Sequence, residues 1–72
     1  MERFYVLPEI GVMSACDSFE EAQKWAAEDS KEAVSLEGDW KTFSGGFLGR
    51  QYYHPNGNPY RRGWILKDLE VA

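Results

Sequence analysis

The chain has very little of what builds a disulfide scaffold, a metal centre or a membrane anchor. Its 72 residues include one cysteine, Cys16, and one histidine, His54. A single cysteine excludes an intrachain disulfide, and small secreted domains usually depend on disulfides, so we expect a reducing, cytoplasmic location. No run of residues is long and apolar enough to cross a membrane, and the first ten residues become polar too early for a signal peptide.

The same scarcity limits the chemistry that the chain can support. A Cys16–His54 pair is formally possible for nucleophilic catalysis, but no known nucleophile motif surrounds either residue. Together with scattered carboxylates, these two residues do not form a cluster with the spacing of a metal site. We therefore expect a protein that is not an enzyme and that has no cofactor and no metal.

What the chain does have is apolar and aromatic side chains. Hydrophobic residues are 43% of the sequence and aromatic residues 15%, which is enough for a core and unlike the composition of a disordered chain. We expect one domain over residues 1–72, close to the lower size limit for a core that stands alone. Both a monomer and a homodimer that buries further apolar surface fit this size.

Charge is unevenly distributed along the sequence. The net charge is −4, but residues 1–40 carry −7 and residues 41–72 carry +3. Because affinity for duplex nucleic acid comes mainly from neutralised phosphates, the overall acidity argues against general duplex binding. The basic second part can still meet an anion.

Two short strands and a helix are predicted for the first part of the chain. Residues 3–7 are aromatic and β-branched, and residues 10–16 alternate, so we expect a hairpin. Ser18 followed by Glu21 is a capping box, which predicts a helix from there to about residue 30. The helical period places Phe19, Ala22, Trp25 and Ala26 in one buried stripe.

After the helix, residues 33–36 restart a β pattern, which has two interpretations. Gly38 and Asp39 form either a tight turn, so that residues 40–43 return as another strand, or part of an unbroken strand with a bulge at Gly38.

Two strands, residues 47–54 and 60–67, are predicted around a turn at Asn56–Gly57, the dipeptide most typical of a hairpin. A two-residue turn there sets the register of the two strands. It pairs Tyr53 with Tyr60, Gln51 with Arg62, Gly49 with Trp64 and Phe47 with Leu66 on one face, and Arg50 with Gly63 and Tyr52 with Arg61 on the other. The fold class is then α+β: one small domain with an antiparallel sheet of four to five strands, in the order ββα then ββ(β), and one helix packed on one face.

Two surfaces are candidates for binding. The hairpin interleaves basic and aromatic residues, which can stack on bases, hold phosphates or form a protein contact, although ordinary sheet surface has the same composition. Its candidate residues are Arg50, Tyr52, His54, Tyr60, Arg61 and Arg62. The alternative is an acidic helix surface that imitates nucleic acid or is simply solvated: Glu20, Glu21, Glu28, Asp29 and Glu32.

In general character the chain resembles small phage and prophage accessory proteins, such as anti-CRISPR, anti-restriction and host-takeover factors. The resemblance rests on the opening FYVLPEIGVMSAC, the capped helix DSFEEAQKWAAEDS and the aromatic ending GRQYYHPNGNPYRRGWILKDL. It implies a non-enzymatic protein that inhibits or modulates a larger intracellular protein or nucleoprotein machine by docking on it, in the host cytoplasm. It transfers no functional residue. A nucleotide or single-stranded nucleic-acid binder that uses the hairpin is the alternative.

Overall fold

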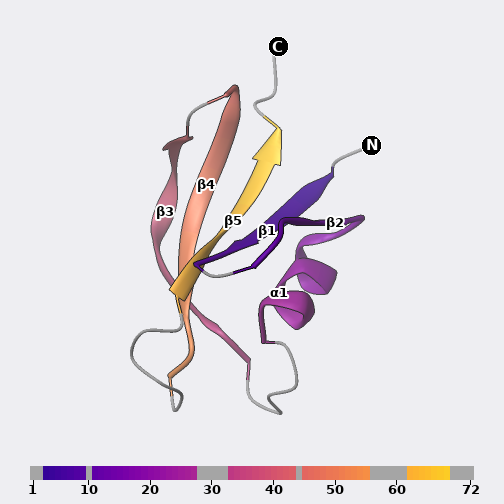
Figure 1. Cartoon of the computed structure of the whole chain (residues 1–72). Helices are drawn as coiled ribbons and strands as arrows, with labels where there is room; N and C mark the ends of the chain where they lie inside the picture. The colour runs from indigo at the N-terminus through magenta and orange to yellow at the C-terminus, as the bar shows by residue number, and fades with distance from the viewer. Residues whose placement is uncertain (1–2, 10, 28–32, 44, 56–61, 69–72) are drawn as a thin grey trace.

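The computed structural model describes residues 3–9, 11–27, 33–43, 45–55 and 62–68. Within these ranges the chain forms one α-helix and a five-stranded antiparallel sheet, which confirms the predicted α+β class (Figure 1). The elements follow one another as β1 (Phe4–Pro8), β2 (Ser14–Cys16), α1 (Phe19–Ala27), β3 (Ser35–Phe43), β4 (Phe47–Tyr53) and β5 (Arg62–Asp68). The strand order across the sheet is β2-β1-β5-β4-β3, so β5 lies between the first hairpin and the β3–β4 hairpin.

The predicted cap of α1 is present. The Glu21 amide donates to the Ser18 hydroxyl at 3.0 Å, and the Ala22 amide donates to the Ser18 carbonyl at 3.0 Å. The Glu21 carboxylate accepts in turn from the amide of Asp17 at 3.3 Å. The Ser18 hydroxyl thus satisfies an amide that the first turn of a helix leaves without a partner, the Ser18 carbonyl accepts the first intrahelical bond, and the helix begins at Phe19. Residues 28–32, over which the helix was expected to end, lie outside the described ranges.

The buried side of α1 differs from the predicted stripe. Ala22, Ala26 and Ala27 are buried, whereas Trp25 is 55% exposed. By helical spacing, Trp25 and Ala27 lie on either side of the line through Ala22 and Ala26, and the sheet meets the side of Ala27. Methyl side chains let the helix lie close to β1, β2 and β5, and an indole ring in that position would hold it away. The prediction of a buried Trp25 is therefore wrong.

The second strand is shorter than expected. Pairing with β1 runs only from Ser14 to Cys16, because the chain turns at Gly11, whose φ is +127°. In contrast, β3 is one continuous strand with a register shift between Glu37 and Lys41 and a φ of +67° at Gly38. The bulged strand, and not the tight turn, is the correct interpretation of this segment.

The predicted register of β4 and β5 is wrong by two residues. Gly49 pairs with Leu66, not Trp64, and Tyr52 pairs with Gly63. Side chains alternate along a strand, so a slip of two leaves every side chain on its expected face. Residues 56–61, which contain the predicted Asn56–Gly57 turn, lie outside the described part of the chain.

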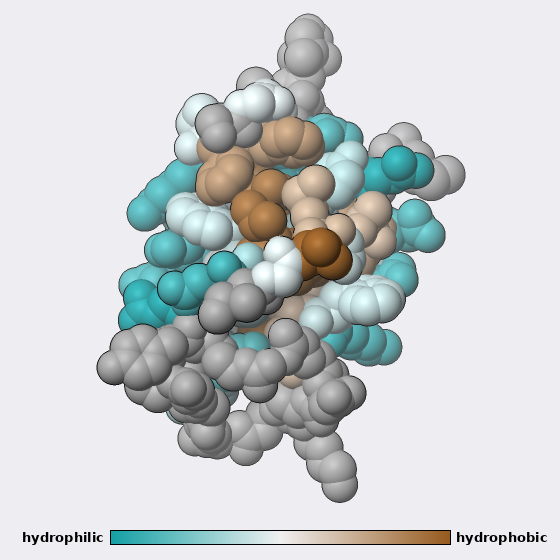
Figure 2. Space-filling view, viewed as in Figure 1, coloured by the Kyte–Doolittle hydropathy of each residue, from teal (hydrophilic) through white to brown (hydrophobic). Residues whose placement is uncertain are grey.

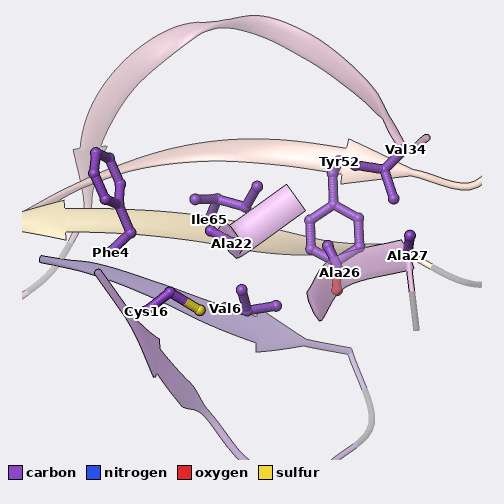
Figure 3. Close-up of a cluster of buried hydrophobic side chains, with 9 residues drawn as sticks. All are labelled: Phe4, Val6, Cys16, Ala22, Ala26, Ala27, Val34, Tyr52 and Ile65. Atoms are coloured by element: carbon purple, nitrogen blue, oxygen red, sulfur yellow. The ribbon is translucent and has the colours of Figure 1, made fainter. Parts of the chain in front are cut away.

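The core lies between α1 and one face of the sheet. Its buried members come from the first hairpin, from α1, from the residue before β3 and from β4 and β5: Phe4, Val6, Cys16, Ala22, Ala26, Ala27, Val34, Tyr52 and Ile65 (Figure 3). The sheet curves around this core, as the position of Trp40 on the edge strand β3 shows. The centroid of its ring lies 6.4 Å from that of Phe4 and 5.6 Å from that of Phe19. The Lys67 ammonium lies 4.5 Å from the Trp40 ring centroid and makes a cation–π contact with it.

Candidate contact surfaces

The structure places Tyr52, a predicted surface residue, in the core. Its side chain is 3% exposed and points toward α1 beside Ala26 (Figure 3). A Cβ on its partner Gly63 would lie 2.5 Å from the Tyr52 hydroxyl, so the ring covers bare backbone at that point. Burial raises the pKa of the Tyr52 phenol because the ionised form loses its hydration. The ring cannot stack on a base or a partner without leaving the core, so we correct its assignment to the contact surface.

The other described residues of the predicted basic surface do not lie together. Arg50 is half-buried, and its Nε donates to the Gly38 carbonyl at 2.7 Å, which ties β4 to the bulge of β3. The half-buried His54 ring meets the Tyr52 ring edge-on, with centroids 6.2 Å apart. Arg62 is exposed, but strand alternation puts it on the sheet face opposite Arg50. Tyr60 and Arg61 lie outside the described residues.

The acidic surface is described over its first turn. Glu20 and Glu21 are exposed there, next to the exposed Asp17. Glu21 also accepts the hydrogen bond from Asp17, so it has a structural role besides its charge. Glu28, Asp29 and Glu32 lie outside the described residues.

Sequence reasoning missed the exposure of three apolar side chains in the first part of the chain. Trp25 is 55% exposed on the outer flank of α1, one helical turn after Glu21. Val12 and Met13, in the connection between β1 and β2, are 84% and 50% exposed. Two alanines four residues apart, Ala22 and Ala26, were the available signal, because small side chains at that spacing allow close helix–sheet contact and leave the larger neighbour outside.

A second missed feature is the sheet face that points away from α1. We call it the open face, and its apolar cluster consists of Tyr5, Leu7, Phe43, Phe47, Trp64 and Leu66, with Gln51 and Tyr53 on the same side of β4. Among the described elements, α1 packs on the other side, so no helix covers these residues. From the viewpoint of Figure 1, Figure 2 shows apolar side chains near the middle of the molecule and hydrophilic ones around them.

Aromatic rings hold the open face together around Gly49. The Tyr5 and Phe47 rings meet edge-on at 5.4 Å, and the Phe43 and Trp64 rings lie 5.1 Å apart. A Cβ on Gly49 would stand 3.0 Å from Leu66 and Trp64 and 3.2 Å from Phe43, so these side chains lie directly over its backbone. Of the six side chains, Leu66 is buried and the other five are half-buried. The open face is therefore mostly apolar, with side chains and no hollow over Gly49.

The charged residues around the open face are of both signs. Strand alternation and register place six of them at its rim, Arg3, Lys41 and Arg62 with Glu9, Glu37 and Asp68, and the exposed Asp39 lies in the bulge between Glu37 and Lys41. The described rim therefore carries mixed charges and little net charge.

The described residues offer little for catalysis. Cys16 is 3% exposed, and burial raises the pKa of its thiol, with smaller contributions from the negative charges of Glu21 and Asp17. A raised pKa keeps the thiol protonated at neutral pH, the opposite of an activated nucleophile. In the part of the chain that the structure describes, no three His, Cys, Asp or Glu side chains are grouped to hold a metal ion. Over the same part, no helix has the length and apolar character needed to cross a membrane.

Comparisons with protein-family models, with curated proteins and with solved structures found no match for this chain.

Proposed function

We propose that this chain is a non-enzymatic binding protein that docks on a larger intracellular protein or nucleoprotein machine and inhibits or modulates it. The observation that carries the proposal is Trp25, which is more than half exposed on a helix flanked by exposed carboxylates. Its activity would be similar to that of small phage and prophage accessory proteins, which act against host systems in the cytoplasm.

Trp25 has the properties of an anchor residue. A tryptophan that inserts into a partner's pocket removes a large apolar area from water and loses little side-chain entropy, which is why tryptophan is enriched among binding hot spots. Because α1 is already capped and packed against the sheet, the indole is presented on a preformed helix. Docking then costs little ordering.

The charges near Trp25 indicate the chemistry of the partner. Residues 17–32 contain six acidic residues and two lysines, and those described, Asp17, Glu20 and Glu21, are exposed. Such a surface attracts a basic partner and is repelled by nucleic acid. We therefore expect an apolar pocket edged by lysine or arginine, as in the groove of a protein that binds nucleic acid.

The nucleotide or single-stranded nucleic-acid alternative has less support. It needs aromatic rings beside cations, but Tyr52 is buried and Arg50 is held by the Gly38 carbonyl. The aromatic rings of the open face lie within a rim of mixed charges and little net charge, which offers little electrostatic attraction to phosphates.

The test compares partner capture by matched variants that each remove one exposed aromatic side chain. Trp25→Ala removes the proposed anchor, and Tyr53→Ala removes a side chain that is 39% exposed on the open-face side of the sheet. We expect the wild type and Tyr53→Ala to retain the same basic protein from lysate, and Trp25→Ala to lose at least ten-fold in affinity for it once it is purified. Equal melting temperatures would confirm that both variants are folded.

Two further readouts complete the test. Glu20→Gln should lower the association rate and weaken its dependence on salt, because the carboxylate steers the encounter and is not part of the cap. The purified partner's activity should fall when the chain is added and recover with Trp25→Ala. Retention by Trp25→Ala with loss by Tyr53→Ala, or capture of nucleic acid in place of protein, would overturn the proposal.

A further inference from the structure

We propose that the open face is the interface with a second copy of this chain, so that two sheets pack face to face in a symmetric dimer. This inference does not depend on the function proposed for Trp25, because that side chain is on α1 and the open face is on the other side of the sheet. A dimer formed in this way leaves both copies of Trp25 on its outside.

The apolar composition of the open face indicates that another surface packs on it. Antiparallel sheets that expose one face to water usually carry polar side chains on it. Here both faces are apolar: Phe4 and Val6 of β1 face the helix, while Tyr5 and Leu7 of the same strand face away. In β5, Ile65 likewise faces the core and Trp64 and Leu66 the open side.

The shape and size of the open face fit a second sheet. Packed sheets lie about 10 Å apart with interdigitating side chains, and a face whose side chains fill its centre over Gly49 suits this arrangement. Four strands and about six residues of each give a face of roughly 20 by 20 Å. Two such faces cover about 800 Å² in total, which is in the size range of weak, transient interfaces. We therefore expect a dimer with a dissociation constant in the micromolar range.

The charges at the rim identify the second sheet as another copy. In a two-fold dimer each surface meets itself, so a rim of one sign would repel its own copy. This rim instead carries groups of both signs, Arg3, Lys41 and Arg62 with Glu9, Glu37 and Asp68, and so can form opposite-charge pairs with itself. A strongly charged partner would find no complement there.

The experiment is sedimentation equilibrium of the full chain over a concentration series into the high micromolar range, with variants at exposed rim positions that leave the core intact. Lys41→Glu unbalances the rim and should weaken the dimer roughly five-fold, since two copies each lose a favourable group. Adding Glu37→Lys restores the balance and should recover most of the affinity. Lys24→Glu, on α1, makes the same change in net charge away from the open face and should leave the dimer unchanged.

A core variant of the interface completes the test. Phe47→Lys places two like charges in the apolar contact and should give a monomer at every concentration, with its fold checked by circular dichroism. If this variant does not fold, the rim series alone decides. A wild type that stays monomeric throughout the series would overturn the proposal, and so would a dimer that Lys24→Glu weakens as much as Lys41→Glu. A dimer lost with Trp25→Ala would also overturn it, because the interface would then be on α1.

Discussion

Gly63 offers the sharpest test of how β5 packs in this fold. A Cβ added there would lie 2.5 Å from the Tyr52 hydroxyl, 2.6 Å from Cζ of the same ring and 2.7 Å from the Leu7 carbonyl oxygen. Atoms that are not bonded to one another do not approach so closely, so either the buried ring leaves its place or β5 separates from β1. We therefore expect Gly63→Ala to destabilise the protein strongly, although alanine adds only one methyl group.

The magnitude follows from two opposing effects. Replacing glycine by alanine inside a strand usually gains about 0.5–1 kcal/mol, because the unfolded chain loses freedom. Overpacking a core usually costs about 1–3 kcal/mol, and Gly63 is at the upper end because one of the atoms it meets is backbone. The net loss is about 2 kcal/mol, which in a domain of this size lowers the melting temperature by roughly 10 °C.

The assay is urea unfolding of the wild type and Gly63→Ala, followed by tryptophan fluorescence at one fixed protein concentration. The same substitution in a Tyr52→Leu background should cost less, since two of the three close contacts belong to the ring. The register predicted from sequence puts Gly63 opposite Arg50, whose flexible side chain would tolerate a methyl group. A Gly63→Ala variant as stable as the wild type, or more stable, would refute the packing of Tyr52 over Gly63.

Two further predictions concern the helix cap and the buried titrating groups. Ser18→Ala removes the acceptor of the Glu21 amide and should lower the free energy of unfolding by about 1 kcal/mol in the same urea assay, whereas an unchanged midpoint would show that the cap contributes nothing. Burial raises the pKa of both Cys16 and Tyr52, so the folded state keeps protons that the unfolded state releases. Stability should therefore be constant at neutral pH and fall as pH rises above the ordinary values of 9.0 and 10.0. Tyr52→Phe should flatten the later part of this fall, and a gain of stability with rising pH would contradict the assignment.

The two-residue error in the register of β4 and β5 has a physical cause. The alternation of side chains specifies which face each residue occupies, but it is equally satisfied by any slip of an even number of residues. The Asn56–Gly57 dipeptide favoured a turn centred on those two residues, and that centre sets a register two residues away from the observed one. Packing decides between the registers, because the buried Tyr52 ring needs a partner without a side chain and finds it in Gly63.

The contact surfaces likewise depend on packing as well as on the sequence pattern. Charge and residue type along the hairpin indicated a basic, aromatic surface, but whether a tyrosine is on the surface or in the core depends on what packs opposite it. Tyr52 became a core residue because α1 covers its face, and Trp25 became a surface residue because the alanines of α1 meet the sheet. Apolar residues at consecutive positions, Phe4 to Leu7 and Trp64 to Leu66, were the signal in the sequence that both faces of the sheet are apolar.

The sequence by itself determined the local features of this protein: the capped start of α1 at Ser18, the strands of aromatic and β-branched residues and the α+β class. These depend on hydrogen bonds and dihedral preferences between residues close together in the chain. Only the tertiary structure decided between a bulge and a tight turn at Gly38, the register of β5, the side of α1 that is buried and which face of the sheet α1 covers. Those features arise from steric fit between residues distant in sequence, such as Tyr52 over Gly63, which no local pattern encodes.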